Sequence, residues 1–489
     1  MADNIWTDGA ATGLWNNTGN WSLGWIPTAG DAAVLDGSQV ADCTVDVAIA
    51  CDEIRTDSGY TGTLDFSTYD ITTDDSGGGS GDMLYNAGTI LAGTGTTHDC
   101  DGDFYNSSAT AWTRGTSKVI LRGTGKTLST RYADRSFYEI DVYGTYTVAG
   151  GYPGGYSYGM LTIKSGGTFT NNYRWSQFGG LTIESGGEVV VGNGSADFMT
   201  CGNDVWNKAG GTVSGLGFIS FSSGGEILEQ AGTWTVSETR MVRGGYRMAG
   251  GTYSGDTFVF EQAWLDGNMY FRLGYLTPAV IFDCDVFIDA DRTGTATFDL
   301  DYYDCDVEFN GDLTIADSVG TLVFTPSTTY PITFGGTGTF TDTTAAGIDL
   351  GDVIVNATSL TLATDLTAGD FTLTAGTLDP AGYDITASGD MDWASGSVIS
   401  DPVGSTILVG GNFTANGQDL STASGAWTLT ITSGTAVASG TGLVANCDAS
   451  AGTEITAAAG PWTDSGGNDN WNFGAVIPIF AHHYHQLTG

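Results

Sequence analysis

The stretch LTIKSGG, residues 161–167, returns 20 residues later as LTIESGG, residues 181–187. A second repeat, DCDV, stands at residues 283–286 and again at residues 304–307, a spacing of 21. Self-similarity at a fixed period is the mark of proteins built from stacked structural repeats. These spacings therefore predict a repeat protein whose unit is about 20 residues long.

Further copies extend the same pattern. AGGTVSG at residues 209–215 returns as AGGTYSG at residues 249–255, and the degenerate copy AGTWTVS stands between them at residues 231–237. In each unit, apolar residues alternate with Thr or Ser, and Gly follows. Such alternation is typical of half-buried strands, and glycine permits the backbone of tight corners. No long segment spaces its apolar residues at helical intervals, so we expect an all-β protein.

Three all-β architectures combine short strands with Gly turns: the sandwich, the propeller and the β-solenoid. Propeller blades repeat at about 40–50 residues, and a sandwich gives no reason for one short motif to return after 20 or 21 residues. The sequence therefore predicts a single-chain parallel β-helix (β-solenoid) with turns of about 20 residues. Equivalent residues of successive turns should then lie about 4.8 Å apart.

The repeats predict which side chains share a position on neighbouring turns. We expect Leu161 and Leu181 to point into the core, one above the other, with Thr162 pointing outward. We expect Cys284 to lie above Cys305 in the same way, with the flanking aspartates forming outward ladders.

Four segments divide the chain. They are an N-terminal Trp-rich cap at residues 1–40, a solenoid array at residues 41–460, a Trp-rich closing motif at residues 461–474 and an apolar, His-rich tail at residues 475–489. A solenoid must cover the edges of its first and last turns, which would otherwise pair with other chains. Bulky Trp residues near both ends suit that task, and an aromatic binding surface is the alternative.

The charge of the chain limits its partners. The sequence holds 15 Lys and Arg against 56 Asp and Glu, a net charge of −41. Nucleic acids and anionic membranes bind proteins through Lys and Arg, so we expect neither as a partner. No run of apolar residues is long enough to predict a membrane span. A solvated acidic surface is the simplest interpretation, and divalent cations could also bind there.

Candidate catalytic residues are scarce. Of the four His residues, His98 alone lies within the array, so a Ser-His-Asp or Cys-His site would depend on it. A polar loop is the simpler interpretation of that His. The seven Cys are an odd number without a CxxC pair, which predicts neither a disulfide framework nor a zinc site. We therefore expect a protein that is not an enzyme.

One segment, DCDGD at residues 99–103, carries a candidate calcium site. Asp99, Asp101 and Asp103 stand at alternate positions, and carboxylate oxygens are the ligands that Ca²⁺ prefers. The segment lacks the final Glu of an EF-hand loop, because Thr110 stands at that position. Calcium is the one cofactor that the sequence suggests.

The tail belongs to no turn of the array. Its candidate docking residues are Ile477, Ile479, Phe480, His482, His483 and Tyr484. Apolar side chains are costly to leave in water, so we expect the tail to bury itself against a second copy of the chain or a larger assembly. The alternative is a lid folded back on the last turn.

Several motifs resemble those of a known group of proteins. WNNTGNW at residues 15–21, followed by Pro27 and by DAAV at residues 31–34, resembles the opening of repeat-rich bacterial surface proteins and phage virion proteins. GTLDPAGYDIT at residues 376–386 is similar to their β-helical repeats, and GGNDNWNF at residues 466–473 is similar to how such arrays finish. The resemblance implies adhesion, fibre or capsid-surface roles without shared catalytic residues.

The N-terminal residues show neither the basic stretch nor the apolar core of the signal peptide that a bacterial adhesin carries. We therefore expect a non-enzymatic structural protein of a phage virion surface (a decoration, fibre or tail component) that is made in the host cytoplasm. One alternative is a secreted bacterial adhesin or extracellular filament subunit. Another is a tailspike-like polysaccharide depolymerase. The expected partners are copies of the chain itself, other virion proteins and a host-surface glycan.

Overall fold

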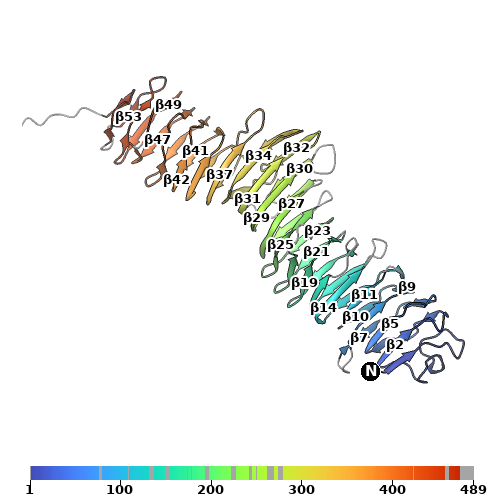
Figure 1. The fold of residues 1–489 in the computed structure, drawn as a ribbon. Helices are drawn as coiled ribbons and strands as arrows, with labels where there is room; N and C mark the ends of the chain where they lie inside the picture. The colour runs from blue at the N-terminus through green and yellow to red at the C-terminus, as the bar shows by residue number, and fades with distance from the viewer. Residues whose placement is uncertain are drawn as a thin grey trace, which may run out of the picture. The chain divides into compact units, whose positions relative to one another are not determined.

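The chain is all-β and forms a parallel β-solenoid with almost no helix. The computed structural model describes residues 2–473 apart from 76–79, 108–109, 131–136, 149–154, 158, 173, 178, 193–197, 222–226, 242–244, 249–250, 262–268, 274–278, 422 and 458–461. The chain divides into two compact units, Met1–Tyr330 and Pro331–Gly489. Within each unit, parallel strands from successive turns lie side by side (Figure 1). The predicted fold class is confirmed.

The first unit is built from parallel sheets that take one strand from each turn. The strands of its first sheet are β1 (Ala2–Ile5), β2 (Asp31–Leu35), β5 (Glu53–Thr56), β8 (Met83–Tyr85), β11 (Phe104–Asn106), β14 (Thr124–Thr130), β16 (Thr145–Val148), β19 (Thr168–Asn171), β22 (Glu188–Val191), β25 (Thr212–Phe221), β27 (Thr233–Met241), β29 (Gly251–Glu261), β31 (Ala279–Asp289) and β33 (Asp306–Phe309). Further strands that join it are β17 (Gly155–Ser157), β20 (Arg174–Gln177), β23 (Phe198–Cys201) and β34 (Leu313–Ala316).

Two other sheets complete the turns of this unit. A 13-stranded sheet contains β4 (Ile49–Cys51), β7 (Ile71–Thr73), β10 (Thr97–Cys100), β13 (Lys118–Leu121), β15 (Glu139–Val142), β18 (Leu161–Ile163), β21 (Leu181–Ile183), β24 (Val205–Asn207), β26 (Ile227–Gln230), β28 (Gly245–Met248), β30 (Met269–Leu273), β32 (Thr295–Asp299) and β35 (Thr321–Thr325). A four-stranded sheet contains β3 (Cys43–Thr44), β6 (Thr63–Asp65), β9 (Gly88–Leu91) and β12 (Thr110–Thr113).

The second unit repeats this construction with shorter strands. Its first series is β36 (Ile332–Phe334), β38 (Val353–Val355), β41 (Phe371–Leu373), β44 (Met391–Trp393), β47 (Phe413–Asn416), β50 (Ala436–Ser439), β53 (Ile455–Thr456) and β55 (Trp471–Asn472). Its second series is β37 (Thr337–Asp342), β39 (Ser359–Leu362), β42 (Thr377–Asp379) and β45 (Val398–Ile399). Its remaining strands are β40 (Leu366–Ala368), β43 (Ile385–Ala387), β46 (Thr406–Val409), β49 (Trp427–Ile431), β52 (Cys447–Asp448), β48 (Asp419–Leu420), β51 (Leu443–Val444) and β54 (Thr463–Asp464).

The 20-residue repeat sets the register of β18 and β21. Leu161 pairs with Leu181 and Ile163 pairs with Ile183, as the repeat predicts. All four side chains are buried, so these positions form a continuous apolar core along the axis. Thr162 differs from the expectation: it is only 8% exposed, although it alternates with the core residues.

The expected stack of Cys284 on Cys305 is wrong. Phe282 of β31 pairs with Phe309 of β33, an offset of 27 residues, and Ala279 pairs with Asp306. Cys284 therefore lies beside Gly311 of the next turn, and Cys305 directly precedes β33. The two DCDV motifs occupy different places in their turns, so the aspartate ladders expected around them do not form.

Aromatic clusters lie near both ends of the array. Near the N-terminus, Trp21 packs edge-to-face against Trp6 and Trp15, with ring centroids 5.2 and 4.6 Å away, and all three rings are buried. Near the other end, the Trp462 and Trp471 rings lie 5.6 Å apart. Large rings in this arrangement remove much apolar surface from water. Buried Trp rings thus lie in both Trp-rich segments, and their role as caps stays a prediction.

Candidate functional site

The few cations of the chain all belong to the first unit. Lys and Arg residues occur only from Arg55 to Arg292, so the second unit contains none. Several of them pair with acids on other turns: Arg55 Nη2 lies 2.6 Å from Asp3, Lys118 Nζ lies 2.8 Å from Asp141, Arg122 Nε lies 2.7 Å from Asp99 and Lys164 Nζ lies 3.0 Å from Glu184. The acids of the second unit must be accommodated in another way.

One series of acids in the second unit binds the backbone of the following turn. The Oδ1 atom of Asp352 accepts the N–H of Asp370, Asp370 accepts that of Asp390, and Asp390 accepts that of Asn412, at 2.8, 2.7 and 2.6 Å. Asn412 Oδ1 in turn accepts the N–H of Thr435 at 3.0 Å. We call Asp352, Asp370, Asp390 and Asn412 the corner ladder, because each directly precedes a strand of the first series.

A glycine precedes every member of the corner ladder. A Cβ atom at Gly369, Gly389 or Gly411 would lie 2.0 to 2.5 Å from the side-chain oxygen of the ladder residue on the turn before. Glycine is needed there because it leaves room for the carboxylate to reach the next N–H. The Gly-Asp and Gly-Asn dipeptides at 351–352, 369–370, 389–390 and 411–412 are the signal in the sequence that could have revealed this ladder.

A Gly-Asp pair in the first unit contains Asp103, one of the predicted calcium ligands, and gives it the same kind of backbone hydrogen bond. Asp82 Oδ1 accepts the N–H of Asp103 at 2.7 Å, and Asp103 Oδ1 accepts that of Thr127 at 2.6 Å. Gly102 precedes Asp103, and a Cβ there would lie 2.3 Å from Asp82 Oδ1. The Asp103 carboxylate therefore links two turns through the backbone.

The other two predicted ligands have different surroundings. Asp99 is paired with Arg122, as described above. Burial raises the pKa of Asp101, and the nearby Asp99 carboxylate raises it further. Within the described part of the chain, no three His, Cys, Asp or Glu side chains gather in a group that could hold a metal ion. The structure thus gives Asp99 and Asp103 protein partners and does not bring the three aspartates together as a metal centre.

His98 lies inside the core. Its Nε2 atom is 2.9 Å from the carbonyl oxygen of Ala92, and its ring packs edge-to-face on Phe66 with centroids 4.6 Å apart. The side chain is fully buried, and this burial lowers its pKa to about 4. His98 is therefore a neutral core residue at physiological pH and is remote from solvent.

The cysteines are core residues as well. All seven are free and buried. Burial raises the pKa of the Cys100 and Cys284 thiols to about 12, so neither is ionised at neutral pH. Thiolates, rather than thiols, are the nucleophilic form. The docking residues predicted in the tail, namely Ile477, Ile479, Phe480, His482, His483 and Tyr484, lie outside the described residues.

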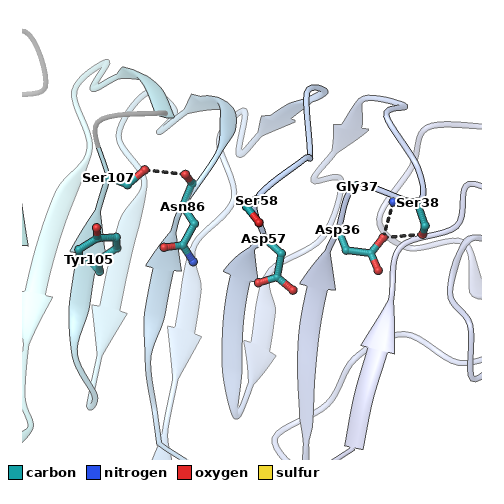
Figure 2. Close-up of a pocket in the computed structure, with 8 residues that line it drawn as sticks. All are labelled: Asp36, Gly37, Ser38, Asp57, Ser58, Asn86, Tyr105 and Ser107. Carbon is teal, nitrogen blue, oxygen red and sulfur yellow. Dashed lines mark hydrogen bonds between the residues drawn. The ribbon is translucent and has the colours of Figure 1, made fainter.

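A hollow of about 730 Å³ opens at one corner of the first unit. Figure 2 shows the residues that line it: Asp36, Gly37, Ser38, Asp57, Ser58, Asn86, Tyr105 and Ser107. Asp36, Asp57, Asn86 and Ser107 directly follow β2, β5, β8 and β11, whose last residues are paired in register. Four successive turns therefore each place one polar residue at this corner, and we call these four the corner row.

Local hydrogen bonds fix parts of the hollow. Asp36 Oδ1 accepts the N–H of Ser38 at 2.8 Å and also its hydroxyl. Ser107 donates its hydroxyl to the carbonyl oxygen of Asn86 at 2.5 Å. Arg55 Nε lies 3.4 Å from the Asp57 carboxylate. In Figure 2 Asp36, Asp57 and Asn86 follow one another on adjacent turns, and the Asp36 carboxylate is turned toward Ser38. Sequence reasoning missed this site, because its residues are separated by unequal spacings.

Comparison with known protein families, with curated proteins and with solved structures gives no match for this chain. Among the residues that the structure describes, no helix is both long and apolar enough to cross a membrane. The arrangement of the described residues is thus the basis for assigning a function.

Proposed function

We propose that the protein is a non-enzymatic structural component of a phage virion surface. The observation that carries the structural role is the corner ladder, in which acidic side chains join successive turns within the second unit. Each bond satisfies a backbone N–H at the corner, directly before the chain enters a strand of the first series. Acidic residues used in this way serve the stability of the solenoid.

The aromatic caps support the same role. Uncovered edges of parallel sheets would pair with other chains and cause aggregation. Buried Trp clusters lie near both ends of the array, where they would cover the edges of the first and last turns. A solenoid covered in this way stays a rod of fixed length. The virion context rests on the resemblance of the repeats to those of virion and surface proteins. Other virion proteins, or a second copy of the chain, are the proposed partners, with residues 475–489 as the docking segment.

Mass spectrometry of gradient-purified phage particles, with particles from a deletion of this gene as the control, tests the proposal. We expect the chain in the wild-type particles at a fixed ratio to a capsid protein. Its absence from particles, together with its presence on bacterial surfaces, would instead favour the adhesin alternative. Release of reducing ends from host glycans by the purified chain would favour the depolymerase alternative.

Deletion of residues 475–489 tests the docking segment. If the tail is an anchor, the shortened chain remains folded but becomes monomeric or leaves the particle. If assembly survives and only the melting temperature falls, the tail is a lid.

A further inference from the structure

The hollow at the corner row is lined by polar groups that do not all have a hydrogen-bond partner within the protein. Among the described residues, the Asn86 side-chain amide and the Tyr105 hydroxyl have no hydrogen-bond partner in the protein, although both line the hollow. The Asp57 carboxylate has Arg55 as its ion-pair partner on one side. Carboxylates accept hydrogen bonds, whereas an amide and a phenol each both donate and accept. The hollow thus presents both kinds of group in one place.

We propose that this hollow binds a neutral saccharide chain. Sugar hydroxyls donate to carboxylates such as those of Asp36 and Asp57, and they exchange hydrogen bonds with the amide of Asn86. The half-buried ring of Tyr105 stands at the far end of the row and offers an apolar face to the C–H groups of a sugar. The volume of about 730 Å³ lies within the range typical of ligand sites, roughly 300–1,000 Å³.

The spacing of the corner row suits a polymer. Its members come from adjacent turns of parallel strands, which lie about 4.8 Å apart. This distance is close to the length of one sugar in an extended chain. Successive sugars of one chain can therefore meet Asp36, Asp57 and Asn86 in turn.

The charges at the hollow exclude two other ligands. Anionic sugars would be repelled by the carboxylates of Asp36 and Asp57 and by the strongly acidic chain as a whole. A divalent cation would be opposed by Arg55, whose guanidinium lies beside Asp57 and also binds Glu53 at 2.8 Å. The hollow is also far larger than a bare ion requires.

This proposal goes beyond the structural role and does not depend on it. Binding of a saccharide can be measured on the purified chain, whereas the structural role is measured on particles. Either proposal can therefore fail without the other.

A direct test measures binding of the full chain to neutral oligosaccharides of α- and β-linked glucose, mannose, galactose and xylose. An oligogalacturonate serves as the anionic comparison, and each titration is repeated with EDTA and with added CaCl₂. The site variants are Asn86→Ala and Tyr105→Ala. The matched control variants are Asn356→Ala, which also follows a strand, and Tyr383→Ala, whose ring is exposed and lies outside the hollow.

We expect at least one neutral oligomer to bind, with or without EDTA. Affinity should fall by about tenfold or more in each site variant, as expected where a hydrogen bond or an aromatic contact is lost. The control variants should bind as the wild type does, and unchanged melting temperatures should show that all variants are folded. No binding to any neutral oligomer, equal binding by wild type and site variants, or binding of Ca²⁺ alone would each overturn the proposal.

Discussion

The carboxylate of Asp370 and the backbone N–H of Asp390 lie on consecutive turns of the second unit, and they are joined by a hydrogen bond of 2.7 Å. Asp370 belongs to a unit that has no Lys or Arg. Its side chain acts here as an acceptor, and no Lys or Arg of its own unit balances its charge.

Substitution of Asp370 separates these two properties. Asp370→Asn keeps the Oδ1 acceptor and removes the charge, as Asn412 does naturally in the same ladder. We expect this variant to melt at the wild-type temperature or above it at low salt, with the gain shrinking in 1 M NaCl because salt screens the repulsion. Asp370→Ala removes the acceptor and should melt lower at both salt concentrations. Equal losses in the two variants, measured by circular dichroism, would contradict the role of the acceptor.

Substitution of Gly389 tests the space that the ladder needs. A Cβ at this position would lie 2.0 Å from Asp370 Oδ1, so we expect Gly389→Ala to lower the free energy of unfolding by about 2 kcal/mol or more. In Gly425→Ala the nearest atom would be at 3.4 Å, so that control should be nearly neutral. Combining Gly389→Ala with Asp370→Ala should relieve part of the clash. Strict additivity of the two substitutions in urea unfolding would refute the explanation.

His98 should make the first unit sensitive to mild acid. Its pKa is about 4 in the folded chain and about 6.5 when unfolded. Because the unfolded state binds the proton first, stability is full above pH 6.5 and declines as the pH falls to 4, by about 3 kcal/mol. His98→Phe should abolish this decline, since Thr96 also donates to the Ala92 carbonyl that His98 contacts. A wild-type profile that is flat from pH 7 to pH 4.5 would contradict the assignment.

A second loss of stability is expected at lower pH in both the wild type and His98→Phe. Hydrogen bonds from neighbouring residues lower the pKa values of Asp390, Asp401 and Asp448. Their contribution is therefore present above the unfolded pKa of about 3.9 and is lost as the pH falls below it. Melting curves from pH 4 to pH 2 measure this loss. It should be smaller in Asp390→Asn, which cannot titrate.

The strand phase of β21 can be tested at two adjacent positions. Ile183 is fully buried, so Ile183→Asp should lower the free energy of unfolding by about 3–5 kcal/mol through burial of an unpaired charge. Thr182 points to the partly exposed face, and Thr182→Asp should cost less than about 1 kcal/mol. Denaturant unfolding of the two variants compares them directly. Similar losses at both positions would contradict this strand phase.

The sequence predicts the fold well where the turns have equal length. Leu161 and Leu181 pair as the repeat requires, because 20 residues make one turn there. The same reasoning fails for Cys284 and Cys305, because the local turn takes 27 residues from Phe282 to its partner. The number of residues in a turn depends on the loops between its strands. Two copies of a four-residue motif do not reveal how long those loops are. The corner row was missed for the same reason, since it depends on the register of four turns.

The absence of Lys and Arg beyond Arg292 has a practical consequence for experiments on this chain. Trypsin cleaves after these two residues, so it has no site in the second unit whether that unit is folded or unfolded. Survival of residues 293–489 in a tryptic digest would therefore say nothing about their stability. Reagents that label lysine amines would likewise mark only the first unit. Local opening of the second unit must instead be followed with a protease that cuts beside aspartate or aromatic residues.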